Sequence, residues 1–227
     1  MTADPILSVR GLTAKRASRV VATDVDIDVF PGDRIYIWGE NGSGKTTLLE
    51  SLLGLLPAEA QSQRWLDRPG TPLSARAFLT GAAVYVRQHN NLFASLTLSE
   101  NLMLGRTVGP ADAEAALAAI IQSFPELGDS LGRLPPKASA GQRQMAAATR
   151  ILMHRPRLFV LDEPTAGLAA KRLSTFYQLL ADAAPMGCAV LFTEQHDELA
   201  RGWATKSFSL ATGALTPTPH HGEPAND

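Results

Sequence analysis

The sequence is poor in several features that would place it in a specialised class. Cys188 is the only cysteine, so no disulfide can form within the chain, and a reducing compartment is expected. No run of about 18 apolar residues occurs, so we predict no membrane-spanning helix. The N-terminus lacks a basic segment followed by an apolar one, so no signal peptide is predicted. Action at a membrane would therefore require a partner.

A basic excess is also missing. The chain has 21 Lys and Arg against 22 Asp and Glu, which gives a net charge of −1 and a pI of about 6.5. Domains that bind nucleic acid usually carry clustered positive charge, so no nucleic-acid partner is predicted. Hydrophobic residues, by contrast, make up 45% of the 227 positions, which is enough to build the core of one large domain.

Short apolar segments alternate with helical patterns along most of the chain. Half-buried strands are predicted at 6–12 and 19–30, and buried strands at 34–38, 81–88, 157–163 and 188–196. Helices are predicted at 46–56, 139–154 and 170–184, with Ser139 as an N-cap. This alternation predicts an α/β domain with a mainly parallel sheet.

The middle of the chain has a different sequence pattern. Residues 89–152 show no clear strand, and the stretches 95–106 and 110–124 look helical and alanine-rich. We interpret 89–152 as a helical subdomain inserted into a core made of residues 1–88 and 153–215. The polar, proline-rich end, 216–227, is expected to be disordered.

The segment GENGSGKTT lies between a predicted strand and a predicted helix, and it fits G-x-x-x-x-G-K-[ST]. Missing side chains let backbone N–H groups curve around an anion, and the following helix directs the positive end of its dipole to the same place. A glycine turn with a stray lysine is the alternative, but the position between strand and helix favours nucleotide binding. The predicted phosphate-binding residues are Gly39, Asn41, Gly42, Ser43, Gly44, Lys45, Thr46 and Thr47.

Two acids close the predicted strand 157–163, at the edge where open α/β sheets bind ligands. Adjacent strand residues point to opposite sides, so the two acids are expected to differ in role. Asp162, together with the hydroxyl of Thr46, is suited to hold Mg²⁺. Glu163 is placed to orient or deprotonate a water molecule. A solvated acid pair at a strand end is the alternative.

Five segments in order resemble the motifs of the ATP-binding subunits of ABC transporters, over residues 6–215. They are GENGSGKTT at 39–47, VRQ at 86–88, ASAGQRQ at 138–144, RLFVLDEPTAGL at 157–168 and TEQHD at 193–197. Parts of these segments are most similar to the branch of the family that imports branched-chain amino acids. The resemblance implies a P-loop NTPase (RecA-like) core with an N-terminal antiparallel β part and an inserted helical subdomain.

The same resemblance implies roles for further residues and for partners. Gln88 would sense Mg²⁺ or the attacking water, and His196 would contact the γ-phosphate of ATP. Ser139, Gly141 and Gln142 would bind the nucleotide held by a second nucleotide-binding subunit, in a homo- or heterodimer. Integral membrane permease subunits would hold the protein peripherally on the cytoplasmic face of the cell membrane.

Several positions depart from the family pattern. Ala138 and Ala140 replace the usual leucine and first glycine of the signature, and Ala169 stands where many relatives have an aspartate. Arg16 occupies the position of the aromatic residue that often stacks on adenine. Its planar guanidinium could lie on the base, and a solvated loop arginine is the alternative.

The main expectation is an ATPase that drives transport. One alternative is an ATP-binding, hydrolysis-poor half of a heterodimer, which the altered signature favours and which Glu163 and His196 oppose. A soluble ABC ATPase acting on DNA or ribosomes lacks support, because there is no basic patch. A P-loop kinase would not need SAGQ or TEQHD.

Overall fold

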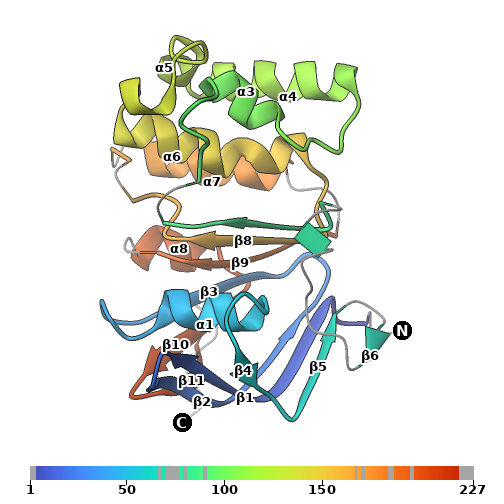
Figure 1. The fold of residues 1–227 in the computed structure, drawn as a ribbon, viewed down its shortest axis with the longest axis vertical. Helices are drawn as coiled ribbons and strands as arrows, with labels where there is room; N and C mark the ends of the chain where they lie inside the picture. The colour runs from blue at the N-terminus through green and yellow to red at the C-terminus, as the bar shows by residue number, and fades with distance from the viewer. Residues whose placement is uncertain are drawn as a thin grey trace.

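The computed structural model describes residues 4–65, 68–69, 77–78, 81–88, 91–166, 168–169, 172–183, 187–194 and 197–219. In Figure 1 the strands occupy the middle and one end of the molecule, and helices α3 to α7 occupy the other end. The strands are β1 (Leu7–Arg16), β2 (Arg19–Val29), β3 (Arg34–Trp38), β4 (Ala58–Glu59), β5 (Ser62–Trp65), β6 (Arg68–Pro69), β7 (Ala83–Val86), β8 (Leu158–Asp162), β9 (Ala189–Thr193), β10 (Lys206–Ala211) and β11 (Ala214–Thr218).

The α-helices are α1 (Lys45–Leu52), α3 (Leu98–Met103), α4 (Pro110–Ser123), α5 (Pro125–Gly128), α6 (Ala140–Ala148), α7 (Leu173–Ala183) and α8 (Asp197–Trp203). The 3₁₀ segments are η1 (Pro135–Lys137) and η2 (Thr149–Met153). In the described part of the chain, no helix combines the length and the hydropathy needed to cross a lipid bilayer.

A mainly parallel sheet forms the centre of the molecule, as the sequence predicts. Its order is β11-β10-β3-β9-β8-β7, in which every neighbouring pair is parallel except β10 with β11. Every residue of β8 and β9 is buried, because the sheet is covered on both faces. The carboxyl ends of β3, β8 and β9 meet at one edge, which positions the residues that follow them.

The N-terminal strands form a second, antiparallel sheet in the order β2-β1-β5-β6, with β4 also paired to β1. The hairpin between β1 and β2 closes with Arg16 opposite Arg19, and Ala17 adopts a left-handed φ of 51° in the turn. This sheet agrees with the predicted N-terminal antiparallel part.

Helix α1 is packed between the two sheets. Its residues Leu48, Leu49 and Leu52 share a hydrophobic cluster with the inward side chains of β1 and β2. Alternate residues of β8, Leu158 and Val160, enter the same cluster, because successive strand side chains point to opposite faces. The start of α1 is therefore held rigidly at the edge of the parallel sheet.

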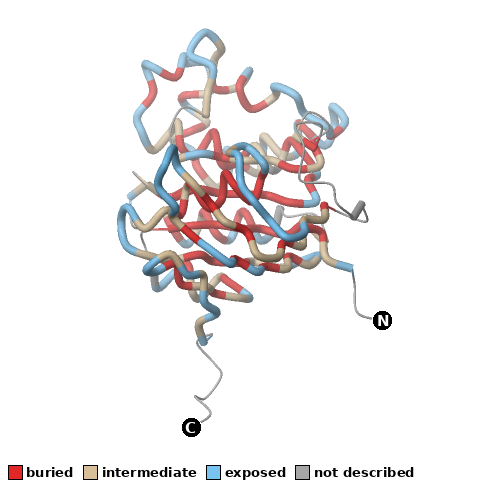
Figure 2. Tube along the Cα trace, turned by 60° about the horizontal axis from the view of Figure 1, so that its bottom comes forward, coloured by how far each residue is buried: buried red, intermediate tan, exposed pale blue. Residues whose placement is uncertain are grey.

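The other face of the parallel sheet is covered by helices. Phe159 of β8 and Phe192 of β9 pack there with Leu98 of α3, Ile120 of α4 and Phe124. Figure 2 shows the buried segments running through the middle of the molecule, with exposed stretches along the loops and the helical end.

Three predicted boundaries were wrong for local reasons. The helix predicted at 46–56 ends at Leu52, because Gly54 adopts a φ of 67° and the N–H groups of Leu55 and Leu56 turn back to the Glu50 carbonyl. The helix predicted at 139–154 changes to 3₁₀ geometry at Thr149, whose hydroxyl bonds to the Met145 carbonyl at 2.7 Å.

The third wrong boundary concerns the C-terminal end. Strand β11 pairs with β10 and continues to Thr218, so residues 216–218 are ordered rather than part of a disordered tail. The strand pairing satisfies the backbone of this polar segment even though its side chains offer little to a core. Residues 220–227 lie outside the described part of the chain.

Candidate functional site

The loop between β3 and α1 needs glycine at particular positions. Gly42 and Gly44 have left-handed φ angles of 82° and 103°. A Cβ atom on Gly44 would lie 2.8 Å from the Cβ of Val21, and one on Gly39 would lie 2.5 Å from the carbonyl oxygen of Leu210. The predicted loop therefore has the close packing that the motif requires, with its N–H groups at the N-terminus of α1.

Lys45 lies inside this loop. It is buried, and its Nζ atom donates to the carbonyl oxygens of Gly39 at 2.8 Å and Glu40 at 3.1 Å. The loop thus curves around an ammonium group and places its charge in the hollow. An anion in this hollow would meet that charge together with the free N–H groups of the helix.

Asp162, the last residue of β8, joins the loop to the parallel sheet. Its Oδ2 atom accepts a hydrogen bond from the Thr46 hydroxyl at 2.7 Å, and its Oδ1 atom accepts one from the Thr193 hydroxyl at 2.8 Å. The side chain is almost fully buried. The two residues predicted to hold Mg²⁺, Thr46 and Asp162, are therefore in direct contact.

Glu163 follows Asp162 in a strained conformation. Its φ is 50°, which is uncommon for a residue with a side chain. Its N–H donates to the Thr193 hydroxyl at 3.1 Å, and its carbonyl accepts from Nε2 of Gln144 at 3.3 Å. Its carboxylate accepts from Nε2 of Gln88 at 2.5 Å. Two residues predicted as catalytic, Gln88 and Glu163, thus meet across two strand ends.

These groups surround one open pocket of about 480 Å³. Of the predicted residues, it brings together Arg16, Asn41, Gly42, Gly44, Lys45, Thr46, Thr47, Gln88 and Glu163. Arg19 and Val21 of β2 complete the wall. His196 was predicted to contact the γ-phosphate, and it lies outside the described residues.

The pKa of a neighbouring tyrosine responds to the charged groups near this pocket. Burial raises the pKa of Tyr85, and the nearby carboxylates of Asp162 and Glu50 raise that pKa further. A cation site is indicated by geometry instead, because the Thr46 hydroxyl and the Asp162 carboxylate are in direct contact and both are oxygen ligands of the kind that Mg²⁺ prefers.

Ser139, Gly141 and Gln142 do not line this pocket. They begin helix α6, where Ser139 is the predicted N-cap. Its Oγ atom accepts from the Gln142 N–H at 3.2 Å, and Oε1 of Gln142 accepts from the Ser139 N–H at 2.9 Å. The Gln142 amide also donates to Ser130 Oγ at 2.6 Å and to the Glu126 carbonyl at 2.9 Å. The Gln142 side chain is therefore engaged within the chain.

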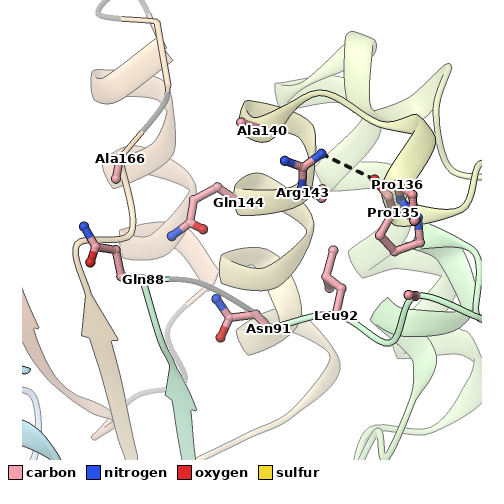
Figure 3. A pocket seen from close by; sticks show the side chains of 10 residues that line it. Gln88, Asn91, Leu92, Pro135, Pro136, Ala140, Arg143, Gln144 and Ala166 are labelled. Carbon is pink, nitrogen blue, oxygen red and sulfur yellow. Dashed lines mark hydrogen bonds between the residues drawn. The ribbon is translucent and has the colours of Figure 1, made fainter.

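A second cavity of about 560 Å³ lies beside the start of α6. Figure 3 shows Gln144 extending from α6 towards Gln88 and Ala166, with Leu92 and Pro135 on the other side. Arg143 contacts the carbonyls of Pro135, at 3.4 Å, and Ala138, at 2.5 Å. The start of α6 thus lies at a different cavity from the α1 loop of the same chain, and the two cavities share Gln88.

The sequence did not single out three polar residues that support the site. Asn91 holds the backbone of Arg87, since its Oδ1 accepts from the Arg87 N–H at 2.7 Å and its Nδ2 donates to the Arg87 carbonyl. Glu50, a buried acid on α1, pairs with two arginines. Its signal in the sequence is a single charge inside the apolar run TTLLESLLGLL.

The third residue is Glu194, which follows β9. Its buried carboxylate accepts from the Thr165 N–H at 3.0 Å and from the Thr165 hydroxyl at 2.7 Å. Burial raises the pKa of Tyr177, and the charge of Glu194 raises it further. Glu194 thereby joins the TEQHD segment to the loop that follows Glu163.

The fold and the pocket define a P-loop nucleoside triphosphatase. The family model described as ABC transporter matches residues 22–166. The chain therefore belongs to the ABC transporter family, as an ATP-binding cassette of the class that hydrolyses ATP to drive transport.

Known proteins agree with this assignment. The chain is 34% identical to the cytochrome c biogenesis ATP-binding export protein CcmA of Nitrosococcus oceani over 196 residues, covering 86% of this chain and 88% of that protein. It is 28% identical to the high-affinity branched-chain amino acid transport ATP-binding protein BraG of Pseudomonas aeruginosa, covering 85% and 83%. It spans 40% of the length of a putative ABC transporter ATP-binding protein of Methanosarcina acetivorans, to which it is 30% identical over 93% of this chain.

Solved structures show the same fold. An ATP-binding subunit of an ABC transporter superposes with a TM-score of 0.78 at 24% identity, covering 92% of this chain and 88% of that chain. A dimeric ATP-binding cassette in a post-hydrolysis state, bound to ADP and Pi, superposes with a TM-score of 0.78 at 22% identity, covering 96% and 100%. The predicted family is confirmed, and the named relatives belong to several transport systems.

Proposed function

We propose that the chain binds and hydrolyses Mg-ATP at the pocket beside α1 and works as one of two cassettes that drive a membrane permease. The observation that carries this proposal is the contact of Gln88 with Glu163 beside the contact of Thr46 with Asp162. A phosphate-binding loop alone would support nucleotide binding but not hydrolysis. An oriented carboxylate next to a metal-type oxygen pair supports hydrolysis.

Phosphate binding is assigned to the loop and to the start of α1. Gly42, Gly44 and the residues Lys45 to Thr47 line the pocket, where the N–H groups at the start of α1 and the Nζ atom of Lys45 would bind phosphate oxygens. In this role Lys45 exchanges its carbonyl contacts with Gly39 and Glu40 for phosphate oxygens. At the far side of the pocket, the guanidinium of Arg16 would lie against the base.

The residues present fit a magnesium ion. The Thr46 hydroxyl, the Asp162 carboxylate and the Gln88 amide oxygen are hard oxygen ligands, and the first two are in contact at 2.7 Å. When it is bound, the ion neutralises charge on the phosphoryl oxygens. Asp162 is held in place by Thr193, so its carboxylate does not need to reorganise to receive a cation.

Glu163 is assigned as the group that orients or deprotonates the attacking water. Its carboxylate lines the pocket, and its backbone is fixed by Thr193 and Gln144. Gln88 positions the carboxylate through its Nε2 atom. His196 would stabilise charge at the γ-phosphate from the TEQHD segment, as the family pattern implies.

A second cassette is needed to complete the site. The start of α6 has free main-chain N–H groups at Ala140 and Gly141, and it lies at a different pocket from the α1 loop of the same chain. We propose that Ser139 and Gly141 close on the nucleotide of a partner cassette, and that Gln142 contributes through its main chain while its side chain supports the N-cap. The dimeric cassette described above supports this arrangement.

The helical subdomain, residues 89–152, is proposed to contact the permease subunits at the cytoplasmic face of the membrane. Phe93 and Leu134 are exposed apolar residues, and each is next in the sequence to a residue that lines the cavity of Figure 3, Leu92 and Pro135. Apolar side chains of this kind at the rim of a cavity suit a protein partner.

Hydrolysis is favoured over the hydrolysis-poor alternative because the altered signature residues leave the catalytic contacts intact. The side chain of Ala138 is buried in the core, so it does not face a nucleotide. Turnover of ATP by the purified chain, compared with Glu163→Gln, tests the proposal. We expect turnover in the first and a rate lower by about 10²- to 10⁴-fold in the second. Nucleotide binding without turnover in both would support the alternative.

A further inference from the structure

Glu50 lies on α1 behind the nucleotide pocket and carries two ion pairs. Its Oε2 atom accepts from Nη1 of Arg16 at 2.9 Å, and its Oε1 atom accepts from Nη2 of Arg87 at 2.6 Å. The side chain of Glu50 is 4% exposed, whereas those of the arginines are 57% and 56% exposed. One buried carboxylate thus holds two cations that reach towards solvent.

The backbone around Arg16 is rigid, but its side chain is not fixed by packing. Arg16 is the last residue of β1 and is paired with Arg19 across the hairpin, and Val21 of the same hairpin packs against Gly44. The long side chain of an arginine loses rotamer freedom when it is ordered, and more than half of this one is exposed. The ion pair with Glu50 is the contact that selects one orientation.

That orientation faces the nucleotide pocket, which Arg16 lines together with Gly42 and Thr47. Only one nitrogen of the guanidinium bonds to Glu50, so the flat face of the group stays available. A guanidinium plane stacks well on an aromatic ring, provided that it is pre-oriented.

We propose that Glu50 is a positioning residue for base recognition: it holds the guanidinium of Arg16 in the plane on which the purine of ATP stacks. This inference rests on the proposed ATP-binding function and extends it to the base. The buried carboxylate is tolerated because Arg87 supplies its second counter-charge. Glu50 also fixes Arg87, which precedes Gln88, so both ends of the pocket are held from one helix.

The test compares the affinities for ATP and for inorganic tripolyphosphate, measured by calorimetry with magnesium present. The affinity for tripolyphosphate measures binding by the phosphate loop alone. The difference between the two affinities measures the contribution of the nucleoside part of ATP. The variants are Glu50→Gln, Arg16→Ala and the double variant. Glu59→Gln is the matched control, because Glu59 is an exposed acid that pairs with Lys15 on the same strand as Arg16.

We expect Glu50→Gln to weaken ATP binding by about three- to thirtyfold, the size of a lost stacking contact, and to change tripolyphosphate binding by less than about twofold. In the Arg16→Ala background, Glu50→Gln should have no further effect on ATP. Glu59→Gln should match the wild type. Unchanged ATP affinity in Glu50→Gln, equal losses for both ligands, or additive losses in the double variant would overturn the inference.

Two further outcomes distinguish a failure of the proposed function from a failure of the base contact alone. If the wild type binds neither ligand, the proposed function fails and the inference fails with it. If the wild type binds tripolyphosphate as tightly as ATP, the phosphate site stands and the base contact is overturned. Should Glu50→Gln not fold, Arg16→Lys carries the test. It keeps a cation for Glu50 and removes the flat face, so we expect the ATP-specific loss, and unchanged ATP affinity would refute the proposal.

Discussion

Nε2 of Gln88 donates a 2.5 Å hydrogen bond to Oε2 of Glu163, joining the end of β7 to the residue after β8. The bond holds a carboxylate in the mouth of the pocket, where a carboxylate left alone would rotate. The hydrogen bond to Gln88 is accepted by Oε2 of Glu163, so it fixes the direction in which the carboxylate faces the pocket.

Replacement of this carboxylate gives the first prediction. Glu163→Gln should lower ATP turnover by about 10²- to 10⁴-fold, the usual contribution of a general base, because the amide cannot accept a proton. ATP affinity should stay within about threefold, since the phosphate cradle is unchanged. Steady-state turnover and equilibrium nucleotide binding measure the two effects. Turnover close to that of the wild type would show that Glu163 is not the base.

Gly44 and Gly32 form a matched pair for the second prediction. Both have left-handed φ angles, 103° and 82°, but a Cβ atom on Gly32 would meet nothing within 4 Å. Gly32→Ala should lower the free energy of unfolding by about 1–2 kcal/mol and leave nucleotide binding intact. Gly44→Ala should destabilise the fold by more, because the new Cβ lies 2.8 Å from Val21, and should weaken nucleotide binding at least about tenfold.

Denaturant unfolding and nucleotide titration of the two glycine variants provide the measurement. Equal nucleotide affinity in both variants would contradict a phosphate-binding role for the backbone at Gly44.

The buried contact of Thr165 with Glu194 gives a third prediction. Thr165→Val removes the hydroxyl that donates to Glu194 at 2.7 Å and keeps the shape of the side chain. The free energy of unfolding should fall by about 1.5–3 kcal/mol, because a buried carboxylate loses a charge-assisted hydrogen bond. Thr216→Val, on the exposed face of β11, should change it by less than about 0.5 kcal/mol. Equal effects in the two variants would rule out a stabilising role for this contact.

His154 gives a prediction about pH. The residue is buried beside Gly81, Gly105 and Arg150, and neither ring nitrogen has a hydrogen-bond partner within the described ranges. Burial, reinforced by the charge of Arg150, lowers the pKa of His154 to about 4 from 6.5. The unfolded chain therefore takes up the proton first, and stability falls as the pH drops from about 6.5 towards 4, by about 3 kcal/mol in total.

The variant His154→Leu should remove this part of the pH dependence. The quantity to measure is the difference in unfolding free energy between wild type and variant, at intervals from pH 7 to pH 4. We expect the difference to shift against the wild type as the pH falls. A difference that does not change with pH would show that His154 is not buried in its neutral form.

The phosphate loop and the central strands could be predicted because their signals are local. A short apolar run of β-branched and aromatic residues is enough to mark β3, and the spacing from Gly39 to Lys45 is fixed by the motif itself. The ion pairs of Glu50 could not be predicted, because they depend on the strand order that brings β1 and β7 beside α1. Strand β11 was missed for the same reason, since its pairing with β10 outweighs its polar composition.

The hydrophobic cluster that joins Phe124 and Leu98 to Phe159 and Phe192 limits how the two halves of the chain can move. Interiors packed in this way resist gradual deformation, and separating the layers would bring large aromatic surfaces into water. Separation of the helical layer from the sheet is therefore unfavourable, and we expect any relative movement of the two layers to keep this cluster packed. A severed fragment spanning only the helices would lack half of its own interior.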